Sequence, residues 1–313
     1  MATFERAEIE AAFEEYRRRA EEHEDVDWAA WADLFTDDAV YVEHHLGTFV
    51  GRDAIREWIV STMAEYSAMT TWIEWHQIEG DRIGFYVWNN LPDPTGAGRQ
   101  FQFPNTTVLR YAGDGRFDEQ HDFYSPHNAE KVFTDWIAAG GRRNTPKDRS
   151  LRGIAGWQPD VPTAAYPRDE VERELQAYRE RGNKAVATGD WDQWADQFTD
   201  DAVYLEHHYG RFEGQDAIRK WINGVMQPFP TMEFPITWHS IEGNRVSALI
   251  PNVLPDPKGG PDGYAFVVNT ILHYAGNGKW SYEEDVYNPN EAKDVIMKWV
   301  ADGGEIPGGV IPD

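Results

Sequence analysis

Residues 28–59 read WAAWADLFTDDAVYVEHHLGTFVGRDAIREWI, and residues 191–222 read WDQWADQFTDDAVYLEHHYGRFEGQDAIRKWI. The two stretches are identical at 23 of 32 positions, at a constant offset of 163 residues. The same offset places the LPDP motif at 91–94 on the LPDP motif at 254–257. Solenoid repeats are much shorter, with units of about 20–50 residues. The chain therefore contains a duplicated domain.

Composition marks the boundary between the two copies. Residues 142–166 are rich in Arg, Lys and Pro and show no apolar periodicity, which is typical of a linker. We therefore predict a first domain over 1–141 and a second over 167–313, each of ordinary domain size. Because two copies of one topology in a chain often mimic a homodimer, we expect the halves to pack as an intramolecular pseudo-dimer. The sequence leaves open whether this unit pairs further as a homodimer.

Charge and composition exclude several classes of protein. The 313 residues include 29 Lys and Arg against 54 Asp and Glu, a formal net charge of -25. Such a field repels phosphate backbones and anionic lipids, so we expect neither nucleic acid nor membrane as a partner. The lack of cysteine excludes disulfides, thiolate nucleophiles and Cys-ligated metals. Without an export signal, a long apolar run or a phosphate-binding motif, we expect a cytoplasmic protein that uses no cofactor.

Each copy is predicted to consist of helices followed by strands. In the first copy, apolar spacing and turn residues predict helices over 5–24 and 54–63, a short helix capped by Asp27, and strands over 39–45, 70–79, 82–90, 100–111 and 116–124. Helices followed by an antiparallel meander predict an α+β fold, in which a curved antiparallel sheet wraps around N-terminal helices as a cystatin-like cone. Small ligands tend to bind in the open end of such a fold.

Two motifs carry a resemblance to a known family. The run FTDDAV at 35–40 and the turn into a helix GRDAIR at 51–56, repeated as GQDAIR at 214–219, resemble the nuclear transport factor 2-like superfamily. Its SnoaL-like and ketosteroid isomerase-like branch is the most similar, over nearly all of both copies. The superfamily includes isomerases, dehydratases, cyclases, epoxide hydrolases and binding modules, so the fold does not settle the function.

The strand over 40–45 carries the first candidate residues. Side chains alternate along a strand, so Tyr41, Glu43 and His45 share one face, while the valine face suits packing under the helices. Glu43 matches the catalytic carboxylate of the ketosteroid isomerase pattern, and an apolar pocket would raise its pKa and make it a usable base. A solvated strand face is the alternative interpretation. The second copy repeats these residues as Tyr204, Glu206 and His208.

Two further positions offer proton-transfer groups. His76 and His239 each follow a tryptophan on a predicted strand, where an imidazole acts as a proton shuttle or bonds a backbone carbonyl for structure. The dehydratases of the superfamily, which this pattern loosely resembles, use a strand histidine as a shuttle. Asp122 and Asp285 on the last strand are similar in place to the aspartate that orients water in its epoxide hydrolases.

The preceding strand departs from the family pattern. Thr107 and Thr270 stand where the isomerases and epoxide hydrolases carry an acid, so neither specific activity is transferred to this chain. These threonines and the nearby asparagines could instead donate hydrogen bonds to a developing oxyanion. Aromatic side chains serve either an apolar ligand or the core. The candidate substrate-binding residues are Tyr41, Trp75, Trp88, Asn105, Tyr124, Tyr204, Trp238, Asn269 and Tyr287.

The sequence supports two hypotheses of different class. In the first, each domain is a cofactor-independent acid–base enzyme, an isomerase or a lyase of the dehydratase/hydratase or cyclase type, acting on a small apolar oxygen-bearing molecule. Its candidate catalytic residues are Glu43, His45, His76, Asp122, Glu206, His208, His239 and Asp285, with no metal. In the second, the same fold is a non-catalytic ligand-binding or scaffold module. A cavity that joins each glutamate to a histidine would favour the enzyme.

Overall fold

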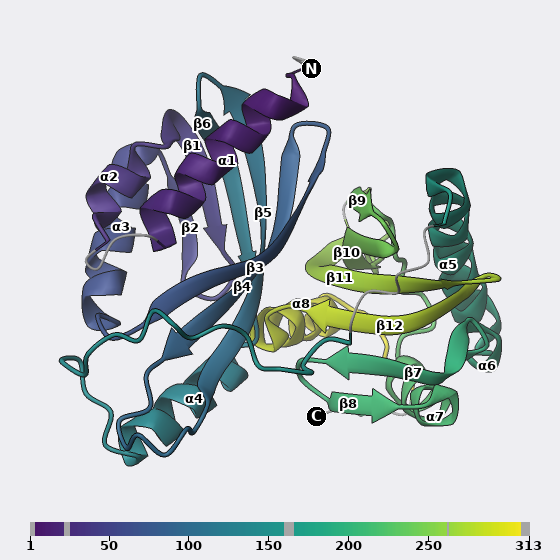
Figure 1. The fold of residues 1–313 in the computed structure, drawn as a ribbon. Helices are drawn as coiled ribbons and strands as arrows, with labels where there is room; N and C mark the ends of the chain where they lie inside the picture. The colour runs from purple at the N-terminus through teal and green to yellow at the C-terminus, as the bar shows by residue number, and fades with distance from the viewer. Residues whose placement is uncertain (1–3, 22–25, 160–165, 262, 308–313) are drawn as a thin grey trace. The chain divides into compact units, whose positions relative to one another are not determined.

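The computed structural model describes residues 4–21, 26–159, 166–261 and 263–307. It divides the chain into two compact units, Met1–Gln158 and Pro159–Asp313. Each unit combines one six-stranded sheet with its own helices (Figure 1). The prediction of an α+β fold in two copies is confirmed. No helix in the described ranges is long and apolar enough to cross a bilayer.

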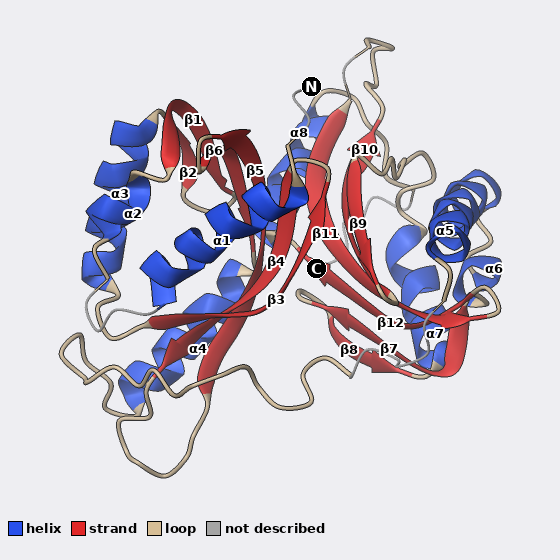
Figure 2. Ribbon diagram, turned by 45° about the horizontal axis from the view of Figure 1, so that its top comes forward, coloured by secondary structure: helices blue, strands red, loops and turns tan. Residues whose placement is uncertain are grey.

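The first unit begins with two helices and then builds its sheet. Its elements are α1 (Arg6–Glu21), α2 (Trp28–Ala32), β1 (Phe35–Glu43), β2 (Gly47–Val50), α3 (Arg52–Glu65), β3 (Thr70–Glu79), β4 (Arg82–Leu91), β5 (Phe101–Gly113), β6 (Arg116–Phe123) and α4 (Pro126–Ala138). The strand order is β2-β1-β6-β5-β4-β3. Helices α1, α2 and α3 lie on one face of this sheet (Figure 2). We call that face the concave face.

The second unit repeats this order of elements. They are α5 (Arg168–Thr188), α6 (Asp192–Ala195), β7 (Phe198–Glu206), β8 (Gly210–Glu213), α7 (Gln215–Met226), β9 (Trp238–Glu242), β10 (Arg245–Leu254), β11 (Tyr264–Gly276), β12 (Lys279–Val286) and α8 (Pro289–Ala301). The strand order β8-β7-β12-β11-β10-β9 matches that of the first unit.

Two features of the fold differ from the prediction. The sheets are mixed rather than purely antiparallel, because β1 pairs parallel with β6 and β7 pairs parallel with β12. A helix also follows the last strand of each unit, where only strands were predicted. Ser125 caps α4 by accepting a hydrogen bond from the Asn128 backbone N–H, and Pro126 occupies the first turn. This Ser-Pro pair is a recognised helix-start signal in the sequence.

The two faces of β1 are reversed relative to the prediction. Tyr41 is 3% exposed and packs in the core, with its ring 4.7 Å from that of Trp58 on α3. Val40 and Val42, which were expected under the helices, are only partly buried on the opposite face. The physical reason is size, because an aromatic ring buries more apolar area against the helices than a valine does. The prediction for the valine face is wrong.

Part of the predicted linker packs against the first unit. The Arg152 guanidinium lies 3.9 Å from the centre of the Trp72 ring. The Trp157 ring lies 5.5 Å from that of Trp88, and Trp75 Nε1 donates to Gln158 Oε1 at 3.1 Å. The segment up to Gln158 therefore belongs to the first compact unit. Residues 160–165 of the predicted linker lie outside the described residues.

Candidate functional site

A hydrogen-bonded carboxyl group lies on the concave face of the first sheet. Asp122, near the end of β6, accepts a hydrogen bond at Oδ2 from the Tyr41 hydroxyl at 2.5 Å. Its Oδ1 accepts from Thr107 Oγ1 at 2.6 Å and from Gln120 Nε2 at 3.0 Å. Strand register explains this meeting, since Thr107 pairs with Asp122 across β5 and β6, and Tyr41 pairs with Gln120 across β1 and β6. Strands β1, β5 and β6 therefore each contribute one residue to a hydrogen-bonded group around Asp122.

The polar chain extends from this cluster in both directions. Asn105 Nδ2 donates to Thr107 Oγ1 at 3.2 Å, and Asn89 Nδ2 donates to Asn105 Oδ1 at 2.9 Å. On the other side, the Tyr16 hydroxyl of α1 donates to Gln120 Oε1 at 3.2 Å. Gln120 was missed in the sequence analysis, although it lies two residues before Asp122 on β6 and therefore shares its face. Its buried amide joins the helix to the carboxyl group.

The second unit repeats the cluster with one change. The Tyr204 hydroxyl donates to Asp285 Oδ2 at 2.5 Å, and Thr270 Oγ1 donates to Asp285 Oδ1 at 2.6 Å. At the position of Gln120 stands Glu283, which is 1% exposed and accepts from the Tyr178 hydroxyl at Oε1 at 2.6 Å. Its Oε2 is buried without a donor of its own in the described structure, because the neighbouring Tyr204 hydroxyl, which lowers the pKa of Glu283, donates to Asp285. The second unit therefore holds two carboxyl groups where the first holds one.

We use the name Asp cluster for Tyr41, Thr107 and Asp122 in the first unit, and for Tyr204, Thr270 and Asp285 in the second.

Burial controls the electrostatics of both Asp clusters. Burial raises the pKa of Asp122 and of Asp285, while the hydrogen bonds from threonine and tyrosine oppose that rise. Burial also raises the pKa of Glu283 well above its usual value, and the adjacent Asp285 adds to this rise. The pKa values of Tyr41 and Tyr204 are raised by burial and by the nearby aspartate charge, so both phenols stay protonated and act as donors.

Glu43 and Glu206 are buried, but the sequence did not predict their partners. Glu43 Oε2 accepts from the backbone N–H groups of His45, at 2.9 Å, and Leu46, and the carboxyl group also bonds Tyr124. Glu206 accepts from the backbone N–H groups of the matching turn and bonds Tyr287. Burial raises the pKa of Glu206 to about 7 and also raises that of Glu43. Each glutamate thus fixes a strand turn while keeping an elevated pKa.

The predicted imidazole relays lie elsewhere in the fold. His45 and His208 are exposed in the turns, and their backbone N–H groups donate to the glutamates. The His76 ring packs 4.6 Å from that of Phe13, and His239 Nε2 lies 2.8 Å from Glu172 Oε1 of α5. Strands β3 and β9 are four places away from β1 and β7 in their sheets. The order of strands therefore separates His76 and His239 from the strands that carry Glu43 and Glu206.

The predicted substrate-binding residues divide between the two faces. Asn105, Tyr124 and Tyr287 bond members of the concave-face polar groups. Strand register places the side chains of Trp75, Trp88, Trp238 and Asn269 on the opposite face. Asn269 there accepts a hydrogen bond from Ser247 Oγ at 3.3 Å. Because Asn269 is adjacent to Thr270 on β11, strand alternation prevents the two from serving one site.

With this geometry in place, comparison with known proteins identifies the family. The model of the SnoaL-like domain matches residues 11–120 and 179–283, more than half of the chain. The chain belongs to the SnoaL-like domain family. Its two matched segments include Tyr41, Thr107 and Gln120 in the first unit and Tyr204, Thr270 and Glu283 in the second. We refer to the units below as the first and second SnoaL-like domains.

Solved structures similar to a single SnoaL-like domain include both enzymes and proteins of unknown role. A hypothetical protein with a ketosteroid isomerase-like fold from Catenulispora acidiphila is 23% identical over 44% of this chain and 96% of its own, with a TM-score of 0.33. An LEH-like epoxide hydrolase from M. tuberculosis is 18% identical over 42% and 93%, with a TM-score of 0.33. A putative SnoaL-like polyketide cyclase from Shewanella denitrificans is 14% identical over 42% and 99%, with a TM-score of 0.32. No curated protein matches the chain significantly.

Proposed function

We propose that the SnoaL-like domains are cofactor-independent acid–base enzymes of the isomerase, dehydratase/hydratase or cyclase type. The observation that carries this proposal is the Asp cluster, because both domains hold one aspartate between a tyrosine and a threonine at the same distances, 2.5 and 2.6 Å. Asp122 and Asp285 keep partial exposure among buried neighbours.

In this proposal the aspartate exchanges a proton with the substrate. A carboxylate has about four lone-pair directions on its two oxygens. The cluster and Gln120 occupy three directions on Asp122, and Tyr204 and Thr270 occupy two on Asp285. A remaining direction accepts the proton removed from the substrate, and the same carboxyl group returns it at another atom, so the protein ends unchanged. The raised pKa of each aspartate strengthens its affinity for that proton.

The surroundings of the cluster support an apolar substrate that carries an oxygen atom. The Tyr41 ring lies 4.7 Å from that of Trp58, and the Tyr204 ring lies 4.6 Å from that of Trp221. These rings pack in the cores of the two domains and make the surroundings of each Asp cluster apolar. The tyrosine hydroxyls donate to the aspartates, so the proton for a substrate carbonyl or hydroxyl oxygen would come from the carboxyl group itself.

One observation favours a second function for the first domain. Gln120 is neutral and donates to Asp122, so this domain lacks the second buried carboxyl group of its duplicate. A first domain that binds a ligand without converting it, beside a catalytic second domain, is therefore the alternative proposal.

The test begins with small molecules that co-purify with the chain, identified by mass spectrometry. Incubating each with the protein in deuterated water should place deuterium on carbon, because a base that removes and returns a proton exchanges it with solvent. The double variant Asp122→Asn and Asp285→Asn should lower the exchange rate by about 10²–10⁴, whereas each single variant should remove only the share of its own domain. The matched control is Asp201→Asn, which makes the same change at an exposed position of β7.

Unchanged exchange in Asp122→Asn together with loss in Asp285→Asn would assign catalysis to the second domain and binding to the first. Unchanged exchange in the double variant would remove the Asp cluster from the chemistry and refute the proposal.

A further inference from the structure

A row of polar side chains crosses the concave face of the first domain over four neighbouring strands. It consists of Asp122 on β6, Thr107 and Asn105 on β5, Asn89 on β4 and Thr71 on β3. Hydrogen bonds of 2.6, 3.2 and 2.9 Å join the first four in that order. Thr71 pairs directly with Asn89 across β3 and β4. We use the name amide row for these five residues.

The Asp122 carboxylate sets the direction of the hydrogen bonds in the amide row. A carboxylate only accepts, so the Thr107 hydroxyl donates to it and uses its own lone pairs to accept from Asn105 Nδ2. The Asn105 oxygen therefore points the other way, where it accepts from Asn89 Nδ2. Asn89 Oδ1 is the acceptor that remains, and within the described residues it receives no hydrogen bond.

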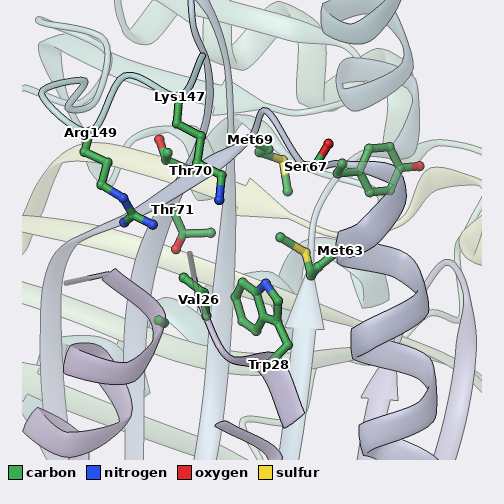
Figure 3. Close-up of a pocket in the computed structure, with 11 residues that line it drawn as sticks. Val26, Trp28, Met63, Ser67, Met69, Thr70, Thr71, Lys147 and Arg149 are labelled. Carbon is green, nitrogen blue, oxygen red and sulfur yellow. The ribbon is translucent and has the colours of Figure 1, made fainter. Parts of the chain in front are cut away.

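Thr71 adds a second unsatisfied group at the same end of the amide row. Its Oγ1 is buried without a hydrogen-bond partner in the described part of the chain, and such an atom calls for an explanation such as a bound group. Thr71 borders a small cavity together with Trp28 and Met63 (Figure 3). The volume of about 20 Å³ admits a hydroxyl group but not a ring. Directly opposed side chains start about 5 Å apart, so one hydroxyl group can bond both Thr71 and Asn89.

The second domain keeps the Asp cluster but not the far end of the amide row. Val268 stands at the position of Asn105, and Phe234 stands at the position of Thr71. Val268 is 4% exposed in an apolar cluster, and Phe234 packs against the same cluster. An apolar surface therefore replaces the amide and the hydroxyl of the first domain.

We propose that the first domain selects a ligand with a hydroxyl group remote from its reacting oxygen, whereas the second domain selects the ligand without that group. The remote hydroxyl donates to Asn89 Oδ1 and accepts from Thr71 Oγ1. In the second domain it would be buried against Val268 and Phe234 without a partner, which costs free energy. The inference rests on the proposed function for placing the reacting end of the ligand beside Asp122, but it does not require the first domain to convert that ligand.

The span and the accessibility of the amide row define the size of this ligand. Asp122 and Asn89 stand two strands apart, about 10 Å across the sheet, which suits a fused two-ring molecule. Both residues are partly exposed on the concave face, and Asn105 between them is 8% exposed, so solvent reaches the row along its length. The rings therefore lie along the row, and only the hydroxyl group enters the space beside Thr71.

The test compares 2-tetralone, a two-ring ketone, with 6-hydroxy-2-tetralone, which adds a hydroxyl group on the ring remote from the ketone. NMR of the Trp58 and Trp221 indole N–H groups reports the two domains separately, because each indole packs on the tyrosine of one Asp cluster. We expect the hydroxylated ketone to bind the first domain about tenfold more tightly than 2-tetralone. In the second domain it should bind several-fold more weakly than 2-tetralone.

Three variants locate the preference in the amide row. Asn89→Leu should abolish it, and Asn105→Val, which gives the first domain the residue of the second, should reduce it to within threefold. Thr71→Val keeps the shape of the side chain and should reduce it several-fold. The matched control is Asn252→Leu, the same change as Asn89→Leu at the corresponding position of the second domain, which should leave the preference of the first domain unchanged. Because both ketones are measured on each variant, a general loss of stability would move the two dissociation constants together.

Equal binding of the two ketones to the first domain would overturn the proposal, as would the same preference in the second domain or the absence of a saturable Trp58 shift with either ketone. Deuterium exchange of the carbons beside the ketone separates this result from the proposed function. A first-domain preference together with unchanged exchange in the Asp122→Asn and Asp285→Asn double variant would refute the acid–base function alone. Equal binding together with loss of exchange in that variant would refute the selection alone.

Discussion

The two SnoaL-like domains share one polar framework but differ at its centre. In the first, Gln120 Oε1 accepts from Tyr16, while its Nε2 donates to Asp122 and to the Tyr41 hydroxyl oxygen. In the second, Glu283 Oε1 accepts from Tyr178 in the same way, but the other oxygen has no donor of its own in the described residues. The duplication has thus kept the shape of the side chain and removed one hydrogen-bond donor.

The second domain lacks the hydrogen-bond donor that stands at the position of Gln120 in the first domain. A proton on Glu283 Oε2 would restore the donor that the Gln120 amide supplies in the first domain. Burial and the adjacent Asp285 raise the pKa of Glu283 well above its usual value, which favours that proton. We therefore expect the second domain to carry one exchangeable proton, at its acid–base site, that the first domain does not have.

Gln120→Glu should produce the largest effect, because it gives the first domain the buried carboxyl pair of the second. The new carboxyl group has a pKa raised by burial in the folded state, so stability falls as the pH rises above the unfolded value near 4.5. We expect a loss of about 3 kcal/mol at pH 8 and almost none at pH 4.5. Hydrogen exchange of the β6 amides at the two pH values measures it.

The matched control for this variant is Gln100→Glu, the same change at an exposed position of the first domain. A pH-independent loss in Gln120→Glu would indicate a packing defect and would refute the account based on proton binding.

Glu283→Gln is the reverse change and should have the opposite sign. Because the folded pKa of Glu283 lies above 4.5, the wild-type carboxyl group destabilises the second domain increasingly as the pH rises, and a neutral amide removes this cost. We expect a gain of about 2 kcal/mol at pH 8 that disappears below pH 4.5. Hydrogen exchange of the β12 amides reports it, with Glu242→Gln as the exposed control. If Glu283→Gln instead lowered stability at pH 8, Glu283 would be ionised in the folded protein and its charge would stabilise the domain.

The sequence predicted the members of the Asp cluster better than their arrangement. Tyr41 and Asp122 were both candidates, and Thr107 was noticed because it replaces an acid. Their meeting depends on the parallel pairing of β1 with β6, a long-range contact that local periodicity does not reveal. Gln120 was missed because a neutral amide looks unremarkable until its neighbours are known, although Glu283 at the matching position marks the site.

Other errors also have identifiable physical causes. The side of β1 that faces the helices was predicted wrongly because both sides carry apolar residues, and alternation alone cannot rank them. A register shift between Ile73 and Trp75 interrupts the alternation of β3, and Trp75 lies on the face opposite His76. Helix α4 was missed despite the Ser125-Pro126 start signal.

Substitution of the threonines should have the smallest effect on stability, and it compares the donors that remain on the two aspartates. Thr107→Val and Thr270→Val each remove one hydrogen bond to the aspartate at nearly constant shape, at a cost of about 1 kcal/mol. Asp122 would retain its bonds from Tyr41 and Gln120, whereas Asp285 would retain the bond from Tyr204 and would have a donor at the position of Gln120 only while Glu283 carries its proton. Once Glu283 is ionised, the missing donor and the added negative charge should raise the pKa of Asp285 more than that of Asp122. Carbon-13 NMR titration of the two carboxyl groups measures both shifts in one sample, and equal shifts would show that Gln120 does not act on the charge of Asp122.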